Sequence, residues 1–217
     1  MLILAVDTTA EFGSIALADE HGLREEVLLH QPQGFSGVLF QQIEALLERQ
    51  EVKLEEIGLF AGASGPGSFT GVRIGLAAVK GLGEVLGKPV VAVSNLAALA
   101  QYGQADLRAT VIDARRGEIF GALYNAAGLA VIPEQVIAFP RFLELLSGRC
   151  FEWVSAGFEP FLPALTGTEF EAFPVATAPR ALAGTIAKLA ARAPRTDASQ
   201  IEANYVRRSD AELLWKL

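Results

Sequence analysis

A glycine-rich stretch at residues 65–73 constrains the fold of this chain more than any other part of the sequence. It reads Gly-Pro-Gly-Ser-Phe-Thr-Gly-Val-Arg and follows an apolar run at residues 57–63 that is typical of a buried strand. Because glycine reaches positive φ freely and proline fixes φ, the stretch predicts a tight turn from the strand into a helix. Ser68 or Thr70 is expected to cap that helix, and Arg73 to lie in its first turns.

Two interpretations of this glycine loop are open. N–H groups at a helix start suit an anion such as a nucleotide phosphate. However, the loop lacks the lysine of a P-loop, and Gly65, Gly67 and Gly71 do not have the spacing of a dinucleotide-binding fingerprint. Neither Ser64 nor Ser68 has the pair of flanking glycines found in a nucleophile elbow. The sequence therefore favours a conformational role, with close backbone packing at the helix start, over contact with an anion.

Composition excludes several classes of protein. The 217 residues are 51% hydrophobic and 20% charged, which suffices for a sizeable core. The net charge of −7 argues against binding nucleic acid unaided, so a role on RNA needs a partner or a local basic patch. The one cysteine, Cys150, fits a reducing compartment, and the apolar run at residues 2–6 is too short for a signal peptide. We expect a cytoplasmic protein with no membrane association.

The same order of elements is predicted twice. The first half has strands at 2–6, 13–18 and 24–30, a helix at 36–50, a strand at 57–63, a helix ending near 86 and a strand at 89–93. The second half has strands at 107–112 and 118–124 and a third ending near 138, a helix at 140–147, strands at 151–155 and 169–175, and a helix at 179–192. We expect an α/β fold of two lobes, residues 1–104 and 105–217, each a mixed sheet with flanking helices. Whether residues 209–217 pack back on the first lobe is left open.

Each predicted lobe opens with a strand that ends in an aspartate, Asp7 or Asp113. This pattern matches the actin-like, Hsp70-like or sugar-kinase-like ATPase architecture (ribonuclease H-like lobes), in which two such aspartates flank phosphate and magnesium at a shared cleft. Asp7, Thr8 and Asp113 are therefore candidate, vestigial phosphate-binding residues. Both aspartates are explained equally well as turn residues that end strands.

Four stretches of the sequence resemble the TsaB (YeaZ) family. They are Ile3-Leu4-Ala5-Val6-Asp7-Thr8-Thr9, the glycine loop with the following Ile74-Gly75-Leu76-Ala77-Ala78-Val79-Lys80-Gly81, Asp113-Ala114-Arg115-Arg116-Gly117-Glu118 and, more weakly, Tyr205-Val206-Arg207-Arg208. TsaB proteins are non-catalytic paralogues of TsaD in the bacterial biosynthesis of tRNA threonylcarbamoyladenosine. The resemblance implies two actin-like lobes and binding to TsaD through helices of the first lobe.

By the same resemblance, the chain is expected to be a scaffold subunit with no catalytic residue, cofactor or metal of its own. It supports threonylcarbamoylation of the adenosine adjacent to the anticodon in ANN-reading tRNAs. The implied partners are a TsaD-type catalytic subunit and a TsaE-type ATPase in a ternary complex, with tRNA reached only through that complex. A homodimer is expected when the chain is alone.

The residues themselves argue against independent catalysis. TsaD-type enzymes bind a metal through a histidine pair on a helix, whereas His21 and His30 are nine residues apart in predicted turn and strand. Many TsaB-like chains begin the first helix with His-Ser, but this chain has Phe35-Ser36, and it lacks the Gly-Gly pair that related ATPases use against adenosine. Three alternatives stay open: an actin-like small-molecule kinase or ATPase that uses Asp7 and Asp113 with magnesium, a metallopeptidase, and a dimerisation module unrelated to tRNA.

The partner surface is predicted on two helices of the first lobe. The helix after the glycine loop mixes small residues, which let another backbone approach closely, with large aliphatic ones, and the preceding helix has an apolar stripe. The predicted interface residues are Leu39, Ile43, Leu46, Gly71, Gly75, Ala78, Val79 and Leu82. The alternative is that the second helix is an intramolecular core helix.

Two arginine pairs, Arg115-Arg116 and Arg207-Arg208, are expected outside helix surfaces. The sequence favours ordinary solvated charges at both pairs. Contact with RNA phosphate or with a nucleotide at a partner interface is the alternative.

Overall fold

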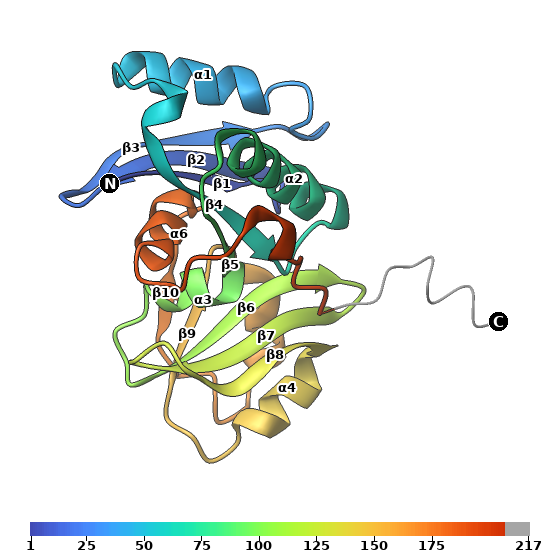
Figure 1. The fold of residues 1–217 in the computed structure, drawn as a ribbon. Coiled ribbons are helices and arrows are strands. Elements are labelled where there is room, and N and C mark those ends of the chain that lie inside the picture. Colours follow the sequence, from blue (N-terminus) through green and yellow to red (C-terminus); the bar gives the residue numbers. More distant parts are fainter. Residues whose placement is uncertain (207–217) are drawn as a thin grey trace. The chain divides into compact units, whose positions relative to one another are not determined.

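The structure is a computed structural model that describes residues 1–206, and it contains two five-stranded sheets (Figure 1). The first sheet consists of β1 (Leu2–Asp7), β2 (Phe12–Asp19), β3 (Gly22–His30), β4 (Ile57–Gly65) and β5 (Val90–Ser94), in the order β3-β2-β1-β4-β5. The second consists of β6 (Leu107–Arg115), β7 (Glu118–Asn125), β8 (Ala130–Ala138), β9 (Glu152–Ser155) and β10 (Val175–Thr177), in the order β10-β9-β6-β7-β8.

The two sheets have the same topology. In the first, β1, β2 and β3 form an antiparallel meander, and β4 and β5 add in parallel next to β1. In the second, β6, β7 and β8 form the meander, and β9 and β10 add in parallel next to β6. The repeated element order in the sequence is thus a repeated topology, and the predicted α/β fold of two mixed sheets with flanking helices is confirmed.

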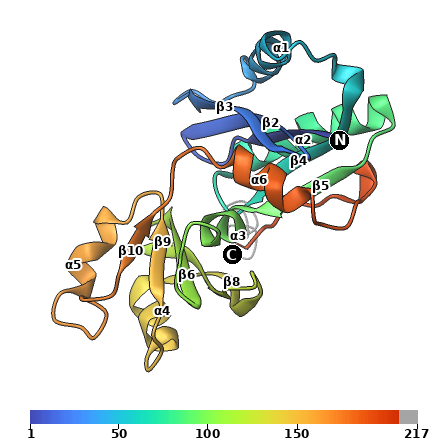
Figure 2. The same cartoon turned by 90° about the vertical axis from the view of Figure 1, so that its left-hand side faces the viewer.

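Helices cover both faces of the first sheet (Figures 1 and 2). The helices are α1 (Leu39–Arg49), α2 (Phe69–Leu86), α3 (Asn95–Ala100), α4 (Phe139–Leu146), α5 (Leu162–Leu165) and α6 (Ala183–Ala190), with 3-10 turns at Leu54–Glu56, Glu159–Phe161 and Ala198–Gln200. Because strand side chains alternate between faces, Leu4 and Val6 of β1 join the core beneath α1 and α2. Helix α6 contacts β1 and β2 on the other face.

The chain divides into two compact units, and the division differs from the expected boundary at residues 104/105. The first unit is Met1–Asn95 with Arg180–Asn204, and Leu96–Pro179 belongs to the second. Helix α6 belongs to the first unit because side chains of β2 and β3 cap its N-terminus. Ser14 Oγ accepts hydrogen bonds from the N–H groups of Leu182 (3.0 Å) and Ala183 (2.9 Å), and Glu26 Oε1 accepts one from Gly184 (2.7 Å).

The segment after α6 stays on the first unit up to Asn204. The N–H of Val90 donates to the Thr196 carbonyl (3.0 Å), and the N–H of Asn204 donates to the Ser64 carbonyl (2.8 Å). The Lys80 ammonium donates to the carbonyl of Ile201 (3.1 Å), whose side chain is buried in the core. Residues 209–217, Arg207 and Arg208 lie outside the described residues.

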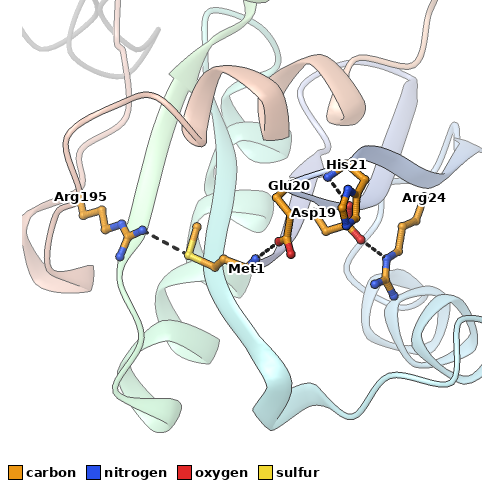
Figure 3. Close-up of polar contacts among 6 residues, drawn as sticks. All are labelled: Met1, Asp19, Glu20, His21, Arg24 and Arg195. Atoms are coloured by element: carbon orange, nitrogen blue, oxygen red, sulfur yellow. Dashed lines mark hydrogen bonds and ion pairs between the residues drawn. The ribbon is translucent and has the colours of Figure 1, made fainter.

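The N-terminus is held at one end of the same sheet (Figure 3). The Met1 amino group pairs with Glu20 in the β2–β3 turn, and Arg195 donates to Met1 Sδ (3.3 Å). Asp19 fixes that turn by accepting hydrogen bonds from the His21 N–H (2.8 Å) and Arg24 Nε (2.6 Å). His21 therefore lies in an exposed turn, as expected from its sequence context.

Aromatic side chains fill the core of the second unit. Trp153 is fully buried and contacts other rings of the cluster, including Phe151 at 4.8 Å between ring centroids. Phe170 and Phe173 pack on Phe151 from a turn, so the strand predicted at residues 169–175 is wrong. Turn hydrogen bonds from the N–H groups of Glu171 and Phe173 to the carbonyls of Thr168 and Phe170 occupy this segment, and β10 begins only at Val175. None of the helices within residues 1–206 is long and apolar enough to cross a membrane.

Candidate functional site

The glycine loop packs directly against the loop between β1 and β2. A Cβ atom on Gly67 would lie 2.5 Å from the Thr9 carbonyl oxygen, and one on Gly71 would lie 2.0 Å from the Thr8 carbonyl oxygen. Thr8 Oγ1 donates to the Gly71 carbonyl (2.7 Å), and the Ser68 N–H donates to the Thr9 carbonyl (2.7 Å). At both glycines, backbone occupies the space that any side chain would need.

Several N–H groups of the glycine loop bond within the chain. Ser68 caps α2 as predicted, because its Oγ accepts a hydrogen bond from the Gly71 N–H (3.3 Å). The Gly65 N–H donates to Asn95 Oδ1 (3.1 Å). Thr70 and Arg73 are exposed, and the Arg73 guanidinium lies 3.7 Å from the centre of the Phe69 ring. This use of the loop donors favours the conformational interpretation over an anion site.

Asp7, the first candidate phosphate residue, is the centre of a buried hydrogen-bond network. Its side chain is only 2% exposed. Oδ1 accepts hydrogen bonds from the Thr9 N–H (2.9 Å) and Thr9 Oγ1 (2.7 Å), and Oδ2 accepts one from Asn95 Nδ2 (3.1 Å). Asn95 Nδ2 also donates to Thr9 Oγ1 (2.9 Å). Together with the bond from Gly65, these contacts join the ends of β1, β4 and β5.

Burial raises the pKa of Asp7 above its ordinary value, although the hydrogen bonds from Thr9 and Asn95 act in the opposite direction. Thr8 is also buried, and its hydroxyl is bonded to Gly71. Both candidate residues of the first lobe therefore have their polar side-chain groups engaged by the protein. The hydrogen bond from Thr8 to Gly71 joins the β1–β2 loop to the glycine loop.

Asp113, the corresponding residue of the second lobe, has a different environment. Its side chain is 37% exposed and forms an ion pair with Arg115, with 3.3 Å between Oδ2 and Nη1. Its Oδ1 accepts a hydrogen bond from the Arg115 N–H (2.7 Å). The carboxylate thus braces the β6–β7 hairpin, whereas that of Asp7 joins three strand ends.

The predicted interface residues require correction, because the structure places them in the core of the first unit. Leu39, Ile43, Leu46, Ala78 and Val79 are each at most 6% exposed, Gly71 and Gly75 are also buried, and Leu82 is partly buried against the same cluster. A Cβ on Gly75 would lie 2.6 Å from Thr8 Oγ1. These residues dock α1 and α2 onto their own sheet, so they do not belong to the surface that these helices expose.

Neither histidine belongs to a metal-like cluster. His30 Nε2 lies within hydrogen-bond distance of Glu11 Oε1 (2.7 Å), and its ring stacks on the Phe12 ring at 4.3 Å. Within residues 1–206, no group of three or more histidine, cysteine, aspartate or glutamate side chains is arranged to hold a metal ion.

Comparison with known proteins identifies the family. A family model described as "TsaD: tRNA N6-adenosine threonylcarbamoyltransferase" matches residues 33–212. The tRNA threonylcarbamoyladenosine biosynthesis protein TsaB of Bacillus subtilis (strain 168) is 33% identical over 154 residues, which are 69% of this chain and 67% of the relative. Its counterpart in Escherichia coli (strain K12) is 32% identical over 170 residues, which are 72% and 71% of the two chains. The chain belongs to the TsaB (YeaZ) family.

Solved structures extend the TsaB (YeaZ) likeness over nearly the whole fold. YeaZ from Pseudomonas aeruginosa superposes with a TM-score of 0.78 at 28% identity, covering 94% of this chain and 99% of its own. A second Pseudomonas aeruginosa structure, described as similar to peptidase YEAZ, gives 0.79 at 27% identity, with 95% and 99% covered. The resemblance recognised from the sequence motifs is thereby confirmed.

An exposed stripe on α2, which the sequence analysis missed, is the surface that this TsaB-like chain offers on that helix. The stripe consists of exposed positions spaced four residues apart, Phe69, Arg73, Ala77, Gly81 and Val85, and Thr70 and Glu84 of the same helix are also exposed. Val85 is 84% exposed and Phe69 is 39% exposed, and Phe40 of α1 is 57% exposed. The four-residue spacing was the available signal, but α2 is apolar on most sides and the sequence did not reveal which side faced the sheet.

Proposed function

We propose that this chain is a non-catalytic scaffold subunit in the biosynthesis of tRNA threonylcarbamoyladenosine. It binds a TsaD-type catalytic subunit, which transfers the threonylcarbamoyl group to the adenosine adjacent to the anticodon in ANN-reading tRNAs. The observation that carries the proposal is the family membership, since the Bacillus subtilis and Escherichia coli relatives are named for this biosynthesis.

The α2 stripe supports binding to another subunit. A single exposed apolar residue on a protein surface is ordinary, but Phe69, Ala77 and Val85 belong to one inclined row of residues spaced four apart on an 18-residue helix. The small residues Ala77 and Gly81 at its middle let a partner helix approach closely. Rows of side chains spaced four apart form the ridges that commonly pack between helices.

The Asp7 network supports a role without independent phosphoryl chemistry. An aspartate that holds magnesium must present free oxygen lone pairs to the ion. The Asp7 oxygens instead accept hydrogen bonds from Thr9 and Asn95 at 2% exposure. We therefore favour the scaffold over an actin-like kinase or ATPase.

The assembly that we propose has further members. A TsaE-type ATPase joins the two subunits in the cytoplasm, and tRNA is contacted only through the complex, consistent with the net charge of −7. In the absence of the TsaD-type subunit, the α2 stripe pairs with a second copy of the chain, which gives a homodimer.

Charges placed on the α2 stripe are expected to abolish docking. Each of Ala77→Glu and Val85→Glu puts a carboxylate into the proposed helix–helix contact, and their combination should weaken binding of the TsaD-type subunit at least about 100-fold. The measurement is co-elution of the two subunits from a size-exclusion column, followed by titration calorimetry.

Leu129→Glu provides the matched control, because Leu129 is also an exposed apolar residue (66%) but lies in the second unit. This variant should bind like the wild type. If the double α2 variant co-elutes with the TsaD-type subunit at wild-type affinity, the α2 stripe is not the docking surface.

A further inference from the structure

The tip of the β6–β7 hairpin places two arginines where the backbone favours glycine. Arg115 has a φ of 65° and Arg116 a φ of 59°, followed by Gly117 at 77°. Most residues other than glycine are strained in this left-handed region. Tight hairpin turns therefore prefer glycine there, or asparagine and aspartate, which tolerate positive φ better than other residues. In the described part of the chain, Glu51 is the other non-glycine residue with positive φ.

Two other hairpin turns of the chain use the expected chemistry. In the β2–β3 turn the residue with positive φ is Gly22, and in the β7–β8 turn it is Gly128. Asn125 closes the latter turn by accepting hydrogen bonds from the Ala127 and Leu129 N–H groups. Arginine at the β6–β7 tip is therefore a departure that folding alone does not require.

The charges at this tip are arranged with the arginines outermost. Both arginines are exposed, and the Arg115 side chain is 85% exposed. The acidic groups are set back on the strands: Asp113 belongs to β6 and braces the Arg115 backbone, and Glu118 is the first residue of β7 and is half-buried. A large polyanion approaching the hairpin tip meets the guanidinium groups first.

The equivalent hairpin of the first lobe, β1–β2, shows what has changed between the lobes. There the aspartate, Asp7, is buried and bonded to Thr9 and Asn95, and the exposed charged group of the loop is the acidic Glu11. In the second lobe Asp113 stays at the surface and two guanidinium groups follow it. Guanidinium groups bind phosphate oxygens directly through paired N–H donors, without a metal ion.

We propose that Arg115 and Arg116 bind backbone phosphate of the RNA substrate, an inference that rests on the proposed function. RNA is favoured over a free nucleotide because a nucleotide site needs walls around the base, whereas an 85% exposed side chain on a turn has none. Phosphate contacts of this kind position an RNA without reading its sequence.

The test is the salt dependence of tRNA binding by the complex of this chain with a TsaD-type subunit. Fluorescence anisotropy of labelled tRNA is followed between about 50 and 200 mM salt for the wild type and for Arg115→Asn/Arg116→Gly. Affinity falls as salt rises, so the slope of log affinity against log salt is negative. Loss of two phosphate contacts should make this slope shallower by about 1.4 to 1.8. At the lowest salt the affinity should fall about tenfold.

Two controls separate this effect from misfolding and from general loss of charge. Asparagine and glycine suit positive φ, so the variant should melt at the wild-type temperature or higher. Arg141→Gln/Arg149→Gln removes two exposed arginines elsewhere in the same unit, one of which is paired with Glu144 as Arg115 is paired with Asp113. This control should keep the wild-type slope.

An unchanged slope and affinity in the Arg115→Asn/Arg116→Gly variant would overturn the inference. Loss of ATP binding with an unchanged tRNA slope would also overturn it, because the tip would then serve a nucleotide. If the two subunits fail to co-elute, the proposed function fails. In that case the inference, which depends on the complex, is overturned with it, whereas an unchanged slope in a complex that does form overturns the inference alone.

Discussion

Gly71→Ala is expected to lower the free energy of unfolding by about 3 kcal/mol or more, because the new Cβ has no space. It would lie 2.0 Å from the Thr8 carbonyl oxygen and 3.0 Å from the carbonyl carbon, and both atoms belong to backbone that is itself buried. A flexible side chain could move aside, but a strand-end backbone cannot do so without disturbing the sheet. Urea denaturation followed by circular dichroism measures the loss.

Gly81→Ala is the matched control on the same helix. A Cβ at Gly81 meets nothing within 4 Å, and the position is exposed. Alanine should therefore stabilise α2 by about 0.5–1 kcal/mol, the usual difference between glycine and alanine in a helix interior. Equal stability of Gly71→Ala and the wild type would show that the glycine loop is not packed on the β1–β2 loop.

The second large effect concerns Asp7 and Asn95, whose side chains are complementary. We expect Asp7→Asn and Asn95→Asp to cost about 3 kcal/mol each, since the first leaves two amide donors facing each other and the second leaves two buried carboxylates. The double exchange restores one amide and one carboxylate, with acceptors for the N–H groups of Thr9 and Gly65. A coupling free energy of about 2–3 kcal/mol is expected from the double-mutant cycle.

The pH dependence of stability provides an independent measure of the same network. Burial raises the pKa of Asp7 above its unfolded value of 3.8, so protonation favours the folded state. The contribution of Asp7 to stability is thus fully present below about pH 3.8 and is lost as the pH rises through the folded pKa. Asp7→Asn should lack this loss in a series of urea titrations.

The carboxyls Asp19, Glu20 and Glu25 have lowered pKa values, owing to hydrogen bonds from Arg24, the Met1 amino group and Arg49 respectively. They act in the opposite direction but equally in both proteins, so the difference between wild type and Asp7→Asn isolates Asp7. A strictly additive cycle together with identical pH profiles would contradict the network.

The sequence was sufficient to predict the strands other than β10, their repeated order and the cap at Ser68. These features depend on local signals, such as short apolar runs bounded by turn residues and a serine before a helical segment. The repeated order was informative because each half has three successive strands followed by alternating helices and strands. Few sheet topologies are compatible with that order of elements.

The return of α6 to the first unit had no local signal. Ser14 caps a helix that begins 169 residues later, and a buried serine in a strand gives no indication of its partner. Asn95 was also missed, although the carboxyl ends of the parallel strands β1, β4 and β5 meet at one edge of the sheet. That rule, applied to the residues after each strand, places Asn95 near Asp7.

The interface residues were misplaced for a different reason. Small and aliphatic residues occur on most sides of α2. The residue types alone therefore did not show which side of the helix is buried and which is exposed. The distinction comes from the Cβ contacts. Gly75 abuts Thr8, whereas Gly81 meets nothing. Two glycines that look alike in the sequence therefore serve core packing and the surface, respectively.

Reconstituted threonylcarbamoylation of tRNA with a TsaD-type and a TsaE-type subunit is the most direct test of the scaffold role. We predict that modification requires this chain, that Ala77→Glu/Val85→Glu reduces it at least about 100-fold, and that Asp113→Asn leaves the rate within about twofold of wild type. Full activity with the double α2 variant, or loss of activity in Asp113→Asn while the complex still forms, would contradict the account.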